Sequence, residues 1–172
     1  MDRICMLFSG ILFLIGCSRV DDSKMVVFSN NLESVYGWSH DTKIERRESH
    51  SGKFAAYADS SQIYNLGFRL PIREMSSSTI YHINAKVWAN CATLNNNSFL
   101  AIDILSGGKS KAYKTARIED FTNQTGIWFG VSATLDVPLD VSPDDEVAVY
   151  VMNHGSTRVW FDDMVIEAIK YK

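Results

Sequence analysis

The sequence lacks several features that would place it in common classes of protein. Its 172 residues contain three prolines and no low-complexity tract, which excludes a long disordered region. The net charge is −3 and no basic cluster appears, which argues against nucleic acid as a partner. There is no internal repeat, and no segment keeps a helical period over three turns. The chain length then suits one domain with its own core.

The residue patterns of common catalytic sites are also missing. No glycine-rich phosphate loop leads from a strand into a helix, and no pair of histidines has zinc spacing. His40-Asp41 and Ser49-His50-Ser51 are adjacent in sequence, but a nucleophile and its base need a geometry that neighbours rarely provide. With 20 acidic residues, some carboxylate pair can always be chosen, so none indicates a glycosidase. We therefore expect that the protein is not an enzyme.

The one long apolar run lies at the start of the chain, from Ile4 to Ile15, after Met1-Asp2-Arg3. A charged start followed by a short apolar segment is typical of a secretory signal, and the run is too short to span a bilayer as a permanent helix. Leu14-Ile15-Gly16-Cys17 resembles the lipobox of bacterial lipoproteins, in which the cysteine is acylated and becomes the new N-terminus. The resemblance implies a signal peptide over residues 1–16 and a tether over residues 17–24.

The cysteines fit this interpretation. Cys5 would leave with the signal peptide, and Cys17 would carry the palmitate that anchors the protein to a membrane. Cys91 then remains alone and cannot form an internal disulfide, so it is expected to be a small buried or loop residue. Ser18 follows Cys17, so the aspartate that retains many lipoproteins at the inner membrane is absent. By resemblance to such lipoproteins, this implies the outer membrane of the cell envelope, with either leaflet possible.

Short runs of alternating apolar and polar residues dominate the remainder of the chain. In the clearest run, Tyr81, Ile83, Ala85 and Val87 share one face of a strand. About eight to ten such strands with turn signals between them predict an all-β fold, an antiparallel β-sandwich or jelly roll, over residues 25–172. Residues 109–124 are polar and ambiguous. The other predicted strands are residues 25–28, 54–58, 63–70, 100–104, 131–137, 147–152 and 159–167.

The last of these strands contains two adjacent carboxylates, Asp162 and Asp163, in an otherwise apolar run. Neighbouring acidic residues repel each other and fit poorly in a core, so a bound cation or strong hydrogen bonds must offset that cost. We expect this strand to close the sandwich against the first strand and to bind a calcium ion there. Either aspartate could be the ligand.

Several motifs together resemble the calcium-binding jelly-roll carbohydrate-binding modules of families 4, 9 and 22, which are galactose-binding-like sandwiches. The resemblance spans nearly the whole mature chain in the same order. The motifs are Asn31-Leu32-Glu33, Gly37-Trp38, His50-Ser51-Gly52-Lys53, Trp128 to Pro138, and Phe161-Asp162-Asp163-Met164.

In that family a structural calcium joins the N-terminal strand, the Ser-Gly loop and the last strand. The resemblance implies side-chain ligands from Glu33 and Asp162, with backbone carbonyls near Asn31 and Lys53 completing the shell. An oxygen donor set of this kind suits a hard cation. The alternative is that Asp162 caps a turn and Glu33 is solvated.

Carbohydrate sites need flat aromatic faces together with amides and charges. Trp88 lies on the polar face of its predicted strand with three polar residues, Lys86, Asn84 and His82, which makes it the candidate sugar platform. The alternative is a structural Trp88 at a strand end, folded under a loop. The tryptophans Trp38, Trp128 and Trp160 are expected to be packing residues. Four residues on the predicted polar faces of other strands could join the site if those strands share a sheet: Asn65, Arg69, Asp103 and Tyr150.

The sequence thus predicts a lipid-anchored cell-envelope protein with a non-catalytic carbohydrate-binding role. The alternative is a structural or adhesion lipoprotein that uses the same sandwich to bind a protein partner. Neither the sugar nor the oligomeric state follows from the sequence.

Overall fold

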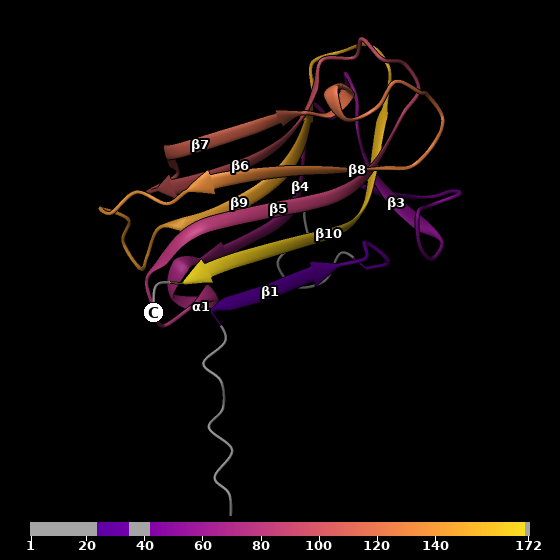
Figure 1. The fold of residues 1–172 in the computed structure, drawn as a ribbon. Helices are drawn as coiled ribbons and strands as arrows, with labels where there is room; N and C mark the ends of the chain where they lie inside the picture. Colours follow the sequence, from indigo (N-terminus) through magenta and orange to yellow (C-terminus); the bar gives the residue numbers. More distant parts are fainter. Residues whose placement is uncertain (1–23, 35–41, 171–172) are drawn as a thin grey trace, which may run out of the picture.

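In the computed structural model, residues 24–34 and 42–170 are described, and they form two antiparallel sheets that pack face to face (Figure 1). The six-stranded sheet has the order β2-β3-β10-β5-β8, with β1 also paired to β10, and the four-stranded sheet has the order β4-β9-β6-β7. The predicted all-β sandwich is therefore confirmed. The strands are β1 (Met25–Asn30), β2 (Ile44–Arg46), β3 (Phe54–Ala58), β4 (Tyr64–Pro71), β5 (Ile80–Cys91), β6 (Ser98–Ser106), β7 (Lys109–Arg117), β8 (Phe129–Asp136), β9 (Glu146–Asn153) and β10 (Val159–Lys170).

In residues 24–34 and 42–170, helical structure is limited to two single turns, α1 (Ile72–Met75) and η2 (Ile118–Phe121). The ambiguous polar segment 109–124 forms the edge strand β7 and then η2. Within the described residues, no helix has the length and apolar character that crossing a membrane requires.

The core lies between the sheets and is built by the alternation that the sequence predicts. In β8, buried and exposed residues alternate without exception, as expected for a strand with one face on the core. Ile83 and Val87 of β5 are buried in the same apolar cluster as Leu100 and Ile102 of β6. Fully burying an aliphatic side chain contributes about 2 kcal/mol, so such strands are held mainly by this layer.

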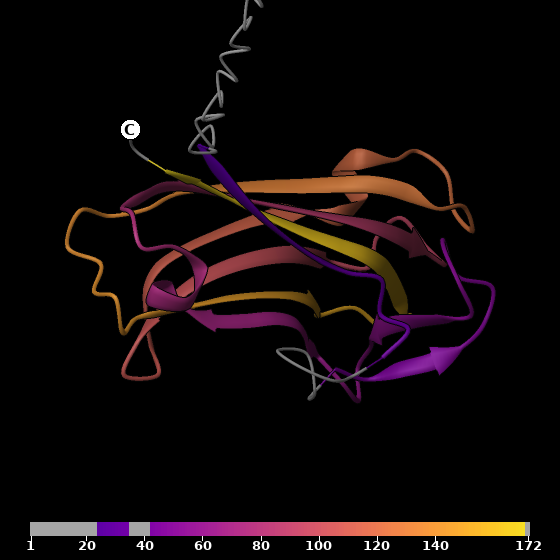
Figure 2. The ribbon, with the colours of Figure 1, turned by 90° about the horizontal axis from the view of Figure 1, so that it is seen from below.

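Strand β10 organises the six-stranded sheet. One of its edges pairs with β5 along most of its length. The other edge is shared: residues 159–161 pair with β3, and residues 164–169 pair with β1 (Figure 2). The first and last strands of the domain therefore lie side by side, as predicted. The register with β5 slips between Asp162, which is opposite Trp88, and Val165, which is opposite Lys86, and Asp163 takes a φ of 47°, so a β-bulge lies at the aspartate pair.

A second irregularity lies in β4, and because of it the predicted orientation of the side chains in that strand is wrong. Simple alternation placed Asn65 and Arg69 on the same face, but the register with β9 slips between Leu66 and Phe68. The intervening Gly67 leaves room for Met164, because a Cβ there would lie 2.5 Å from the methionine sulfur. As a result Asn65 is fully buried, whereas Arg69 is exposed.

Candidate functional site

The 50–54 loop, from His50 to Phe54, receives two carboxylates from opposite ends of the described chain. Glu33, three residues after β1, accepts hydrogen bonds through Oε1 from the backbone N–H groups of Lys53 at 2.8 Å and Phe54 at 2.9 Å. Asp162, in β10, accepts one through Oδ2 from the N–H of Ser51 at 2.9 Å. Hydrogen bonds to ionised acceptors are stronger than neutral ones, so the loop joins both ends of the domain.

The glycine in this loop is required by its surroundings. Gly52 has a φ of +64°, and a Cβ there would lie 2.3 Å from the Glu33 carboxyl group. Only glycine combines this left-handed conformation with such a close approach. The Ser-Gly sequence therefore brings the backbone of the loop directly against Glu33.

The two aspartates of the bulge have different surroundings. Asp162 is fully buried, and its Oδ1 accepts a hydrogen bond from the N–H of Asp163 at 2.8 Å. Asp163 is partly exposed and accepts a hydrogen bond from the Ser51 hydroxyl at 2.7 Å. Its Oδ2 lies 2.6 Å from Nδ1 of His50. Asp162 is thus the aspartate enclosed beneath the loop, and Asp163 is the one that positions His50.

Burial has a measurable consequence for Asp162. Desolvation of the carboxylate raises its pKa from 3.8 to about 6, although the N–H donor of Ser51 acts in the opposite direction. The described structure places no cationic side chain on this carboxylate. An ionised Asp162 at neutral pH therefore costs stability unless a positive charge reaches it.

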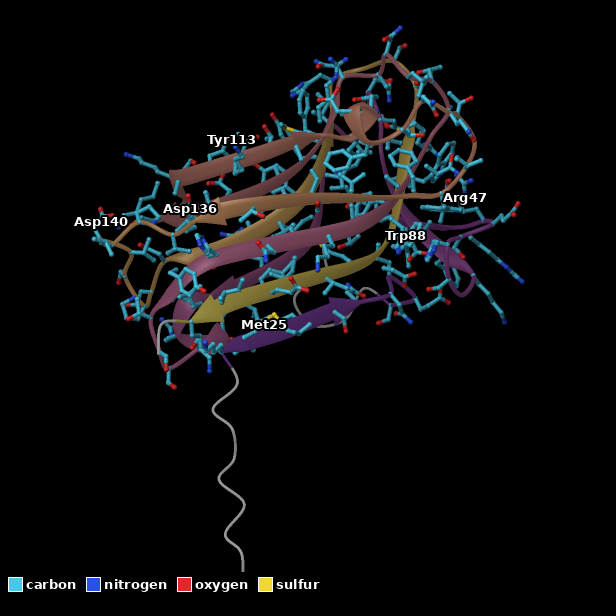
Figure 3. The ribbon with its side chains drawn as sticks, viewed as in Figure 1. Met25, Arg47, Trp88, Tyr113, Asp136 and Asp140 are labelled. Carbon is cyan, nitrogen blue, oxygen red and sulfur yellow. The ribbon has the colours of Figure 1, made fainter. Side chains whose placement is uncertain are left out.

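His50 connects the loop to Trp88. The imidazole stacks on the indole with ring centroids 3.8 Å apart and planes inclined by 10°. Trp88 lies within β5, three residues before its end, and is 39% exposed. It is therefore neither at a strand end nor fully under a loop, since one indole face contacts His50 and the residue stays partly open to solvent (Figure 3). Beside it, a hollow of about 380 Å³ is lined by Lys86, Trp88, Gly130, Ser132, Asp163 and Val165 with their neighbours.

The other two described tryptophans hold the same segment of chain. The Arg47 guanidinium lies 3.9 Å from the ring centre of Trp160 and 5.7 Å from that of Trp128. Each cation–π contact contributes about 1 kcal/mol when partly exposed. Trp160 also donates its indole N–H to Glu45. These contacts support the packing role predicted for Trp128 and Trp160.

A second cluster of polar and aromatic side chains covers the outer face of the four-stranded sheet. We call it the tyrosine face: Tyr64, Tyr113, Tyr150, Arg69, Asp103 and Met152. The strand register places these residues in neighbouring rows, because Tyr64 is opposite Met152, Leu66 is opposite Tyr150, and Asp103 lies between Ala148 and Tyr113. Tyr64 is 55% exposed and Tyr113 is 46% exposed. A hollow of about 330 Å³ lies here, lined by Tyr64, Leu66, Arg69, Tyr150 and their neighbours.

Contacts within the tyrosine face hold the rings in place. The rings of Tyr64 and Tyr150 meet edge to face with centroids 6.0 Å apart, and the Tyr113 hydroxyl lies 3.5 Å from the sulfur of Met152. Burial raises the pKa of Tyr150 and, less strongly, that of Tyr113, so both hydroxyls stay protonated at neutral pH. Arg69 pairs with Glu146 at 2.6 Å. Asp103 is nearly buried and accepts a hydrogen bond from Ser110 at 2.7 Å.

The structure divides the predicted sugar-binding residues between two sheets. His82, Asn84, Lys86 and Trp88 belong to β5 of the six-stranded sheet. Lys86 forms an ion pair with Glu167 at 2.7 Å, and Nδ1 of His82 lies 2.6 Å from Asp136. Arg69, Asp103 and Tyr150 belong to the other sheet, so the eight residues do not form one site.

Asn65 has a structural role instead. Its side-chain amide donates to the carbonyls of Lys43 and Tyr57 and accepts from the N–H of Lys43. These bonds join the segment before β2 and strand β3 to β4, and the side chain of Asn65 is fully buried, so it is not accessible to a ligand.

Sequence reasoning missed three residues, Tyr64, Tyr113 and His50, as members of a site. Alternation alone placed Tyr64 with the core residue Phe68, because the Gly67 bulge is not apparent from the pattern. Tyr113 lies in a polar edge strand whose register only the fold provides, and His50 meets Trp88 through a loop. The motif residues Gly37 and Trp38, and also Cys17, lie outside the described residues.

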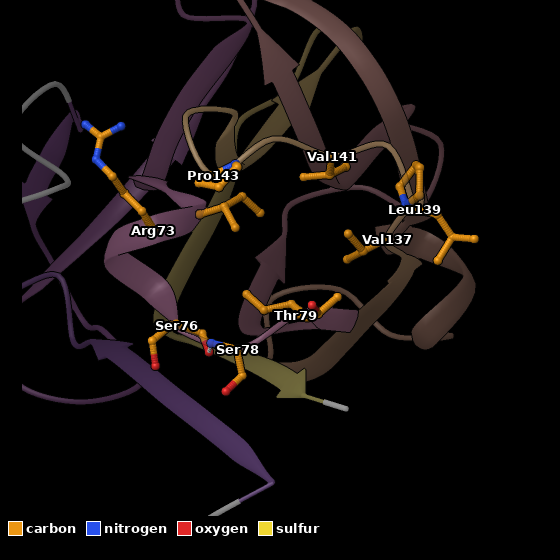
Figure 4. Close-up of a pocket in the computed structure, with 12 residues that line it drawn as sticks. Arg73, Ser76, Ser78, Thr79, Val137, Leu139, Val141 and Pro143 are labelled. Atoms are coloured by element: carbon orange, nitrogen blue, oxygen red, sulfur yellow. Dashed lines mark hydrogen bonds between the residues drawn. The ribbon is translucent and has the colours of Figure 1, made fainter. Parts of the chain in front are cut away.

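Other features of the described chain offer little chemistry. Cys91 is buried, and burial raises the pKa of its thiol to about 12, so the reactive thiolate is scarce at neutral pH. In residues 24–34 and 42–170, no group of three or more His, Cys, Asp or Glu side chains is placed to hold a metal ion. A further hollow of about 270 Å³ lies between α1, residues 76–80 and residues 137–143 (Figure 4), with mainly apolar and serine side chains around it.

Comparison with known proteins gives a result at the level of fold. No model of a known protein family matches the sequence, and no curated protein matches it. Among solved structures, it is similar to the CBM22-2 xylan-binding domain from Paenibacillus barcinonensis Xyn10C, with a TM-score of 0.52 and 14% identity over 82% of this chain and 98% of that chain. The chain has the jelly-roll fold of a carbohydrate-binding module.

A carbohydrate-binding module of a second family aligns over a similar length. This is CBM6cm-2 from Cellvibrio mixtus lichenase 5A, solved with cellotriose, with a TM-score of 0.49 and 13% identity over 86% of this chain and 99% of that chain. The likeness to the xylan-binding domain agrees with the antiparallel jelly-roll sandwich that the sequence predicts.

The raised pKa of Asp162 predicts a specific pH dependence. An acid with a higher pKa in the folded state binds more protons when folded, so its contribution to stability falls as the pH rises from about 4 to above 6. In chelator-treated buffer, the unfolding free energy of the parent should therefore fall by about 3 kcal/mol relative to Asp162→Asn between pH 3.5 and pH 7. Urea denaturation at several pH values measures this difference.

The exposed Asp120 provides a control. Asp120→Asn removes the same charge from an exposed position, so the difference between the parent and this variant is the baseline for the comparison. A parent–Asp162→Asn difference that changes with pH no more than this baseline would contradict the assignment of a desolvated carboxyl group to Asp162.

Proposed function

We propose that this protein is a non-catalytic carbohydrate-binding module and that the tyrosine face is its glycan-binding surface. The observation that carries this proposal is the exposure of Tyr64 and Tyr113 beside Tyr150 on the outside of the four-stranded sheet. The apolar face of a pyranose stacks on such rings, and the phenol hydroxyls bond to the sugar hydroxyls.

The polar residues of the tyrosine face suit recognition better than hydrolysis. A glycosidase needs two carboxylates free to act as acid and as base or nucleophile. Here Asp103 is nearly buried and bonded to Ser110, and Glu146 is paired with Arg69. Both groups can orient sugar hydroxyls at the edge of the rings, and neither is free to be a reacting carboxylate.

Removing tyrosine rings should weaken glycan binding without unfolding the protein. Tyr64→Ala and Tyr113→Ala each remove a largely exposed ring, so we expect at least tenfold weaker binding, or about 1.4 kcal/mol, with unchanged thermal stability. Affinity electrophoresis through gels that contain xylan, mixed-linkage β-glucan or another soluble polysaccharide measures the retention.

Phe121→Ala, which removes an equally exposed ring in η2, is the matched control and should leave retention unchanged. If the parent is retained by no polysaccharide, the carbohydrate proposal fails. That outcome favours the alternative of a structural or adhesion protein with a protein partner.

We also propose a structural calcium at the junction of the 50–54 loop and the aspartate bulge. Glu33 and Asp162 would supply side-chain oxygens, with backbone carbonyls near Asn31 and Lys53. The buried Asp162 carboxylate, with no cationic side chain beside it, supports a bound positive charge. In Glu33, both described hydrogen bonds go to Oε1, which leaves Oε2 for a ligand. Oxygen donors alone suit calcium.

Calcium should stabilise the fold more at neutral than at acidic pH, because Asp162 must be ionised to bind it. At a hundredfold excess over the dissociation constant, the gain would be about 2.7 kcal/mol, visible as a higher melting temperature. Glu33→Gln keeps the oxygen that accepts from Lys53 and Phe54 but removes the charge, so it should lose most of the gain. A melting temperature that is the same in calcium and in chelator at pH 7 would rule the site out.

Finally, we propose that Cys17 carries a lipid and that the protein is held at the outer membrane of the cell envelope. The lipobox-like sequence supports this, and β1 begins eight residues after Cys17, near α1 and the end of β10 (Figure 1). Metabolic labelling with palmitate should label the parent and not Cys17→Ala. An unlabelled parent that fractionates with soluble proteins would contradict lipidation.

A further inference from the structure

The hollow beside Trp88, on the opposite sheet from the tyrosine face, has the properties of a ligand site. It is lined by three strands, β5, β8 and β10, on the outer face of the six-stranded sheet. The exposed indole of Trp88 forms one wall. Its orientation is fixed by the stacked ring of His50, which in turn lies 2.6 Å from Asp163. A platform fixed in this way loses little conformational entropy when a ligand binds.

Gly130 gives the most informative observation about this hollow. It lies directly opposite Trp88 in the pairing of β5 with β8. Glycine within a strand weakens the strand and is often found where a ligand or another backbone approaches closely. Its backbone does not require glycine, since φ lies outside the left-handed region, and a Cβ there would meet no atom within 4 Å.

The same observation excludes the usual structural reason for this pair. A large aromatic side chain can stabilise a strand by covering a glycine across the sheet. If the indole of Trp88 covered Gly130, a Cβ at that position would contact it. Trp88 instead leans on His50, and the space above Gly130 stays open. The glycine therefore keeps a cavity open and has no packing role.

The charges around the hollow favour a neutral ligand. Lys86 is paired with Glu167 at 2.7 Å, and Asp163 is within 2.6 Å of His50, so each charged group on the wall already has a partner. These groups and the exposed hydroxyl of Ser132 can still bond to hydroxyl groups. An aromatic platform with such groups around it matches a sugar ring, which has one apolar face and an equatorial ring of hydroxyls.

We propose that this hollow is a second saccharide site, which binds one neutral pyranose unit on Trp88 above Gly130. It is independent of the tyrosine face, because the two sites lie on different sheets and share no residue. A chain with both sites could bind two glycan segments, or two parts of one glycan, on opposite sides of the sandwich.

Gly130→Val tests this proposal with little risk to the fold. An added Cβ meets no atom within 4 Å at this position and valine is favoured in strands, so the unfolding free energy should stay the same or rise. The valine side chain would fill the space above the sheet, so binding at Trp88 should weaken at least tenfold. Ser132→Ile, which points into the same hollow from the same strand, is the second variant.

The probes are methyl β-glycosides of xylose, glucose and galactose, added to the full chain labelled with nitrogen-15 at its tryptophan indoles. With at least one glycoside, the indole N–H signal of Trp88 should shift saturably in the parent and in Tyr64→Ala. It should not shift in Gly130→Val or Ser132→Ile at the same concentration. Methyl β-glucuronide, which is anionic, should bind more weakly than the best neutral probe.

Three results would overturn the proposal: no shift of Trp88 with any neutral glycoside, an equal shift in folded Gly130→Val and Ser132→Ile, or tighter binding of the glucuronide. Loss of polysaccharide retention in Tyr64→Ala with an intact Trp88 shift would separate the second site from the tyrosine face. Polysaccharide retention by the parent that is lost in Tyr64→Ala, together with no Trp88 shift in either protein, would show that only the tyrosine face binds glycans.

Discussion

The structure depends on a short loop whose backbone N–H groups bind carboxylates from the two ends of the domain. Ser51 donates to Asp162, and Lys53 and Phe54 donate to Glu33. Strand β10 cannot pair continuously along this edge, because β3 leaves it at Phe161 and β1 joins it at Met164. The loop fills the interruption and makes one sheet from segments that are distant in sequence.

This arrangement couples stability to the site at Trp88. The loop that encloses Asp162 also carries His50, which fixes the indole of Trp88, and Arg47 anchors the preceding residues on two tryptophans. Burial of Asp162 imposes an electrostatic cost that a bound cation would remove. A positive charge at the bulge would therefore stabilise the loop. Through His50 it would also stabilise the position of Trp88 in the proposed second saccharide site. The tyrosine face lies on the other sheet and does not depend on this loop.

The predictable parts of the structure were those that follow from local pattern. Strict alternation in residues 81–88 and 131–137 predicted both the strands and their buried faces. The adjacent acids 162 and 163 predicted strong hydrogen bonds or a cation in the last strand, and the structure shows the hydrogen bonds, but the register slip at this point was not predicted. The fold class and the pairing of the first with the last strand followed from these features and from the family motifs.

The parts that sequence could not provide depend on long-range register. The register of β4 slips by one residue at Gly67, and one extra residue moves every side chain after it to the opposite face of the sheet. Asn65, before the slip, is therefore buried, whereas Arg69, after the slip, is exposed. Which strands share a sheet decided that Trp88 and Tyr150 lie on opposite sides. The stacking of His50 on Trp88 joins residues from a loop and a strand, and no periodic pattern encodes such a contact.

Native-state hydrogen exchange of the loop amides tests the central role of these carboxylates most directly. We expect the amides of Ser51, Lys53 and Phe54 to exchange slowly, and the amide of Gly52, which has no acceptor in the described structure, to exchange fast. In Glu33→Ala, Lys53 and Phe54 should lose their protection, and exchange along β1 should accelerate. Equal, fast exchange of all four amides in the parent would contradict the account.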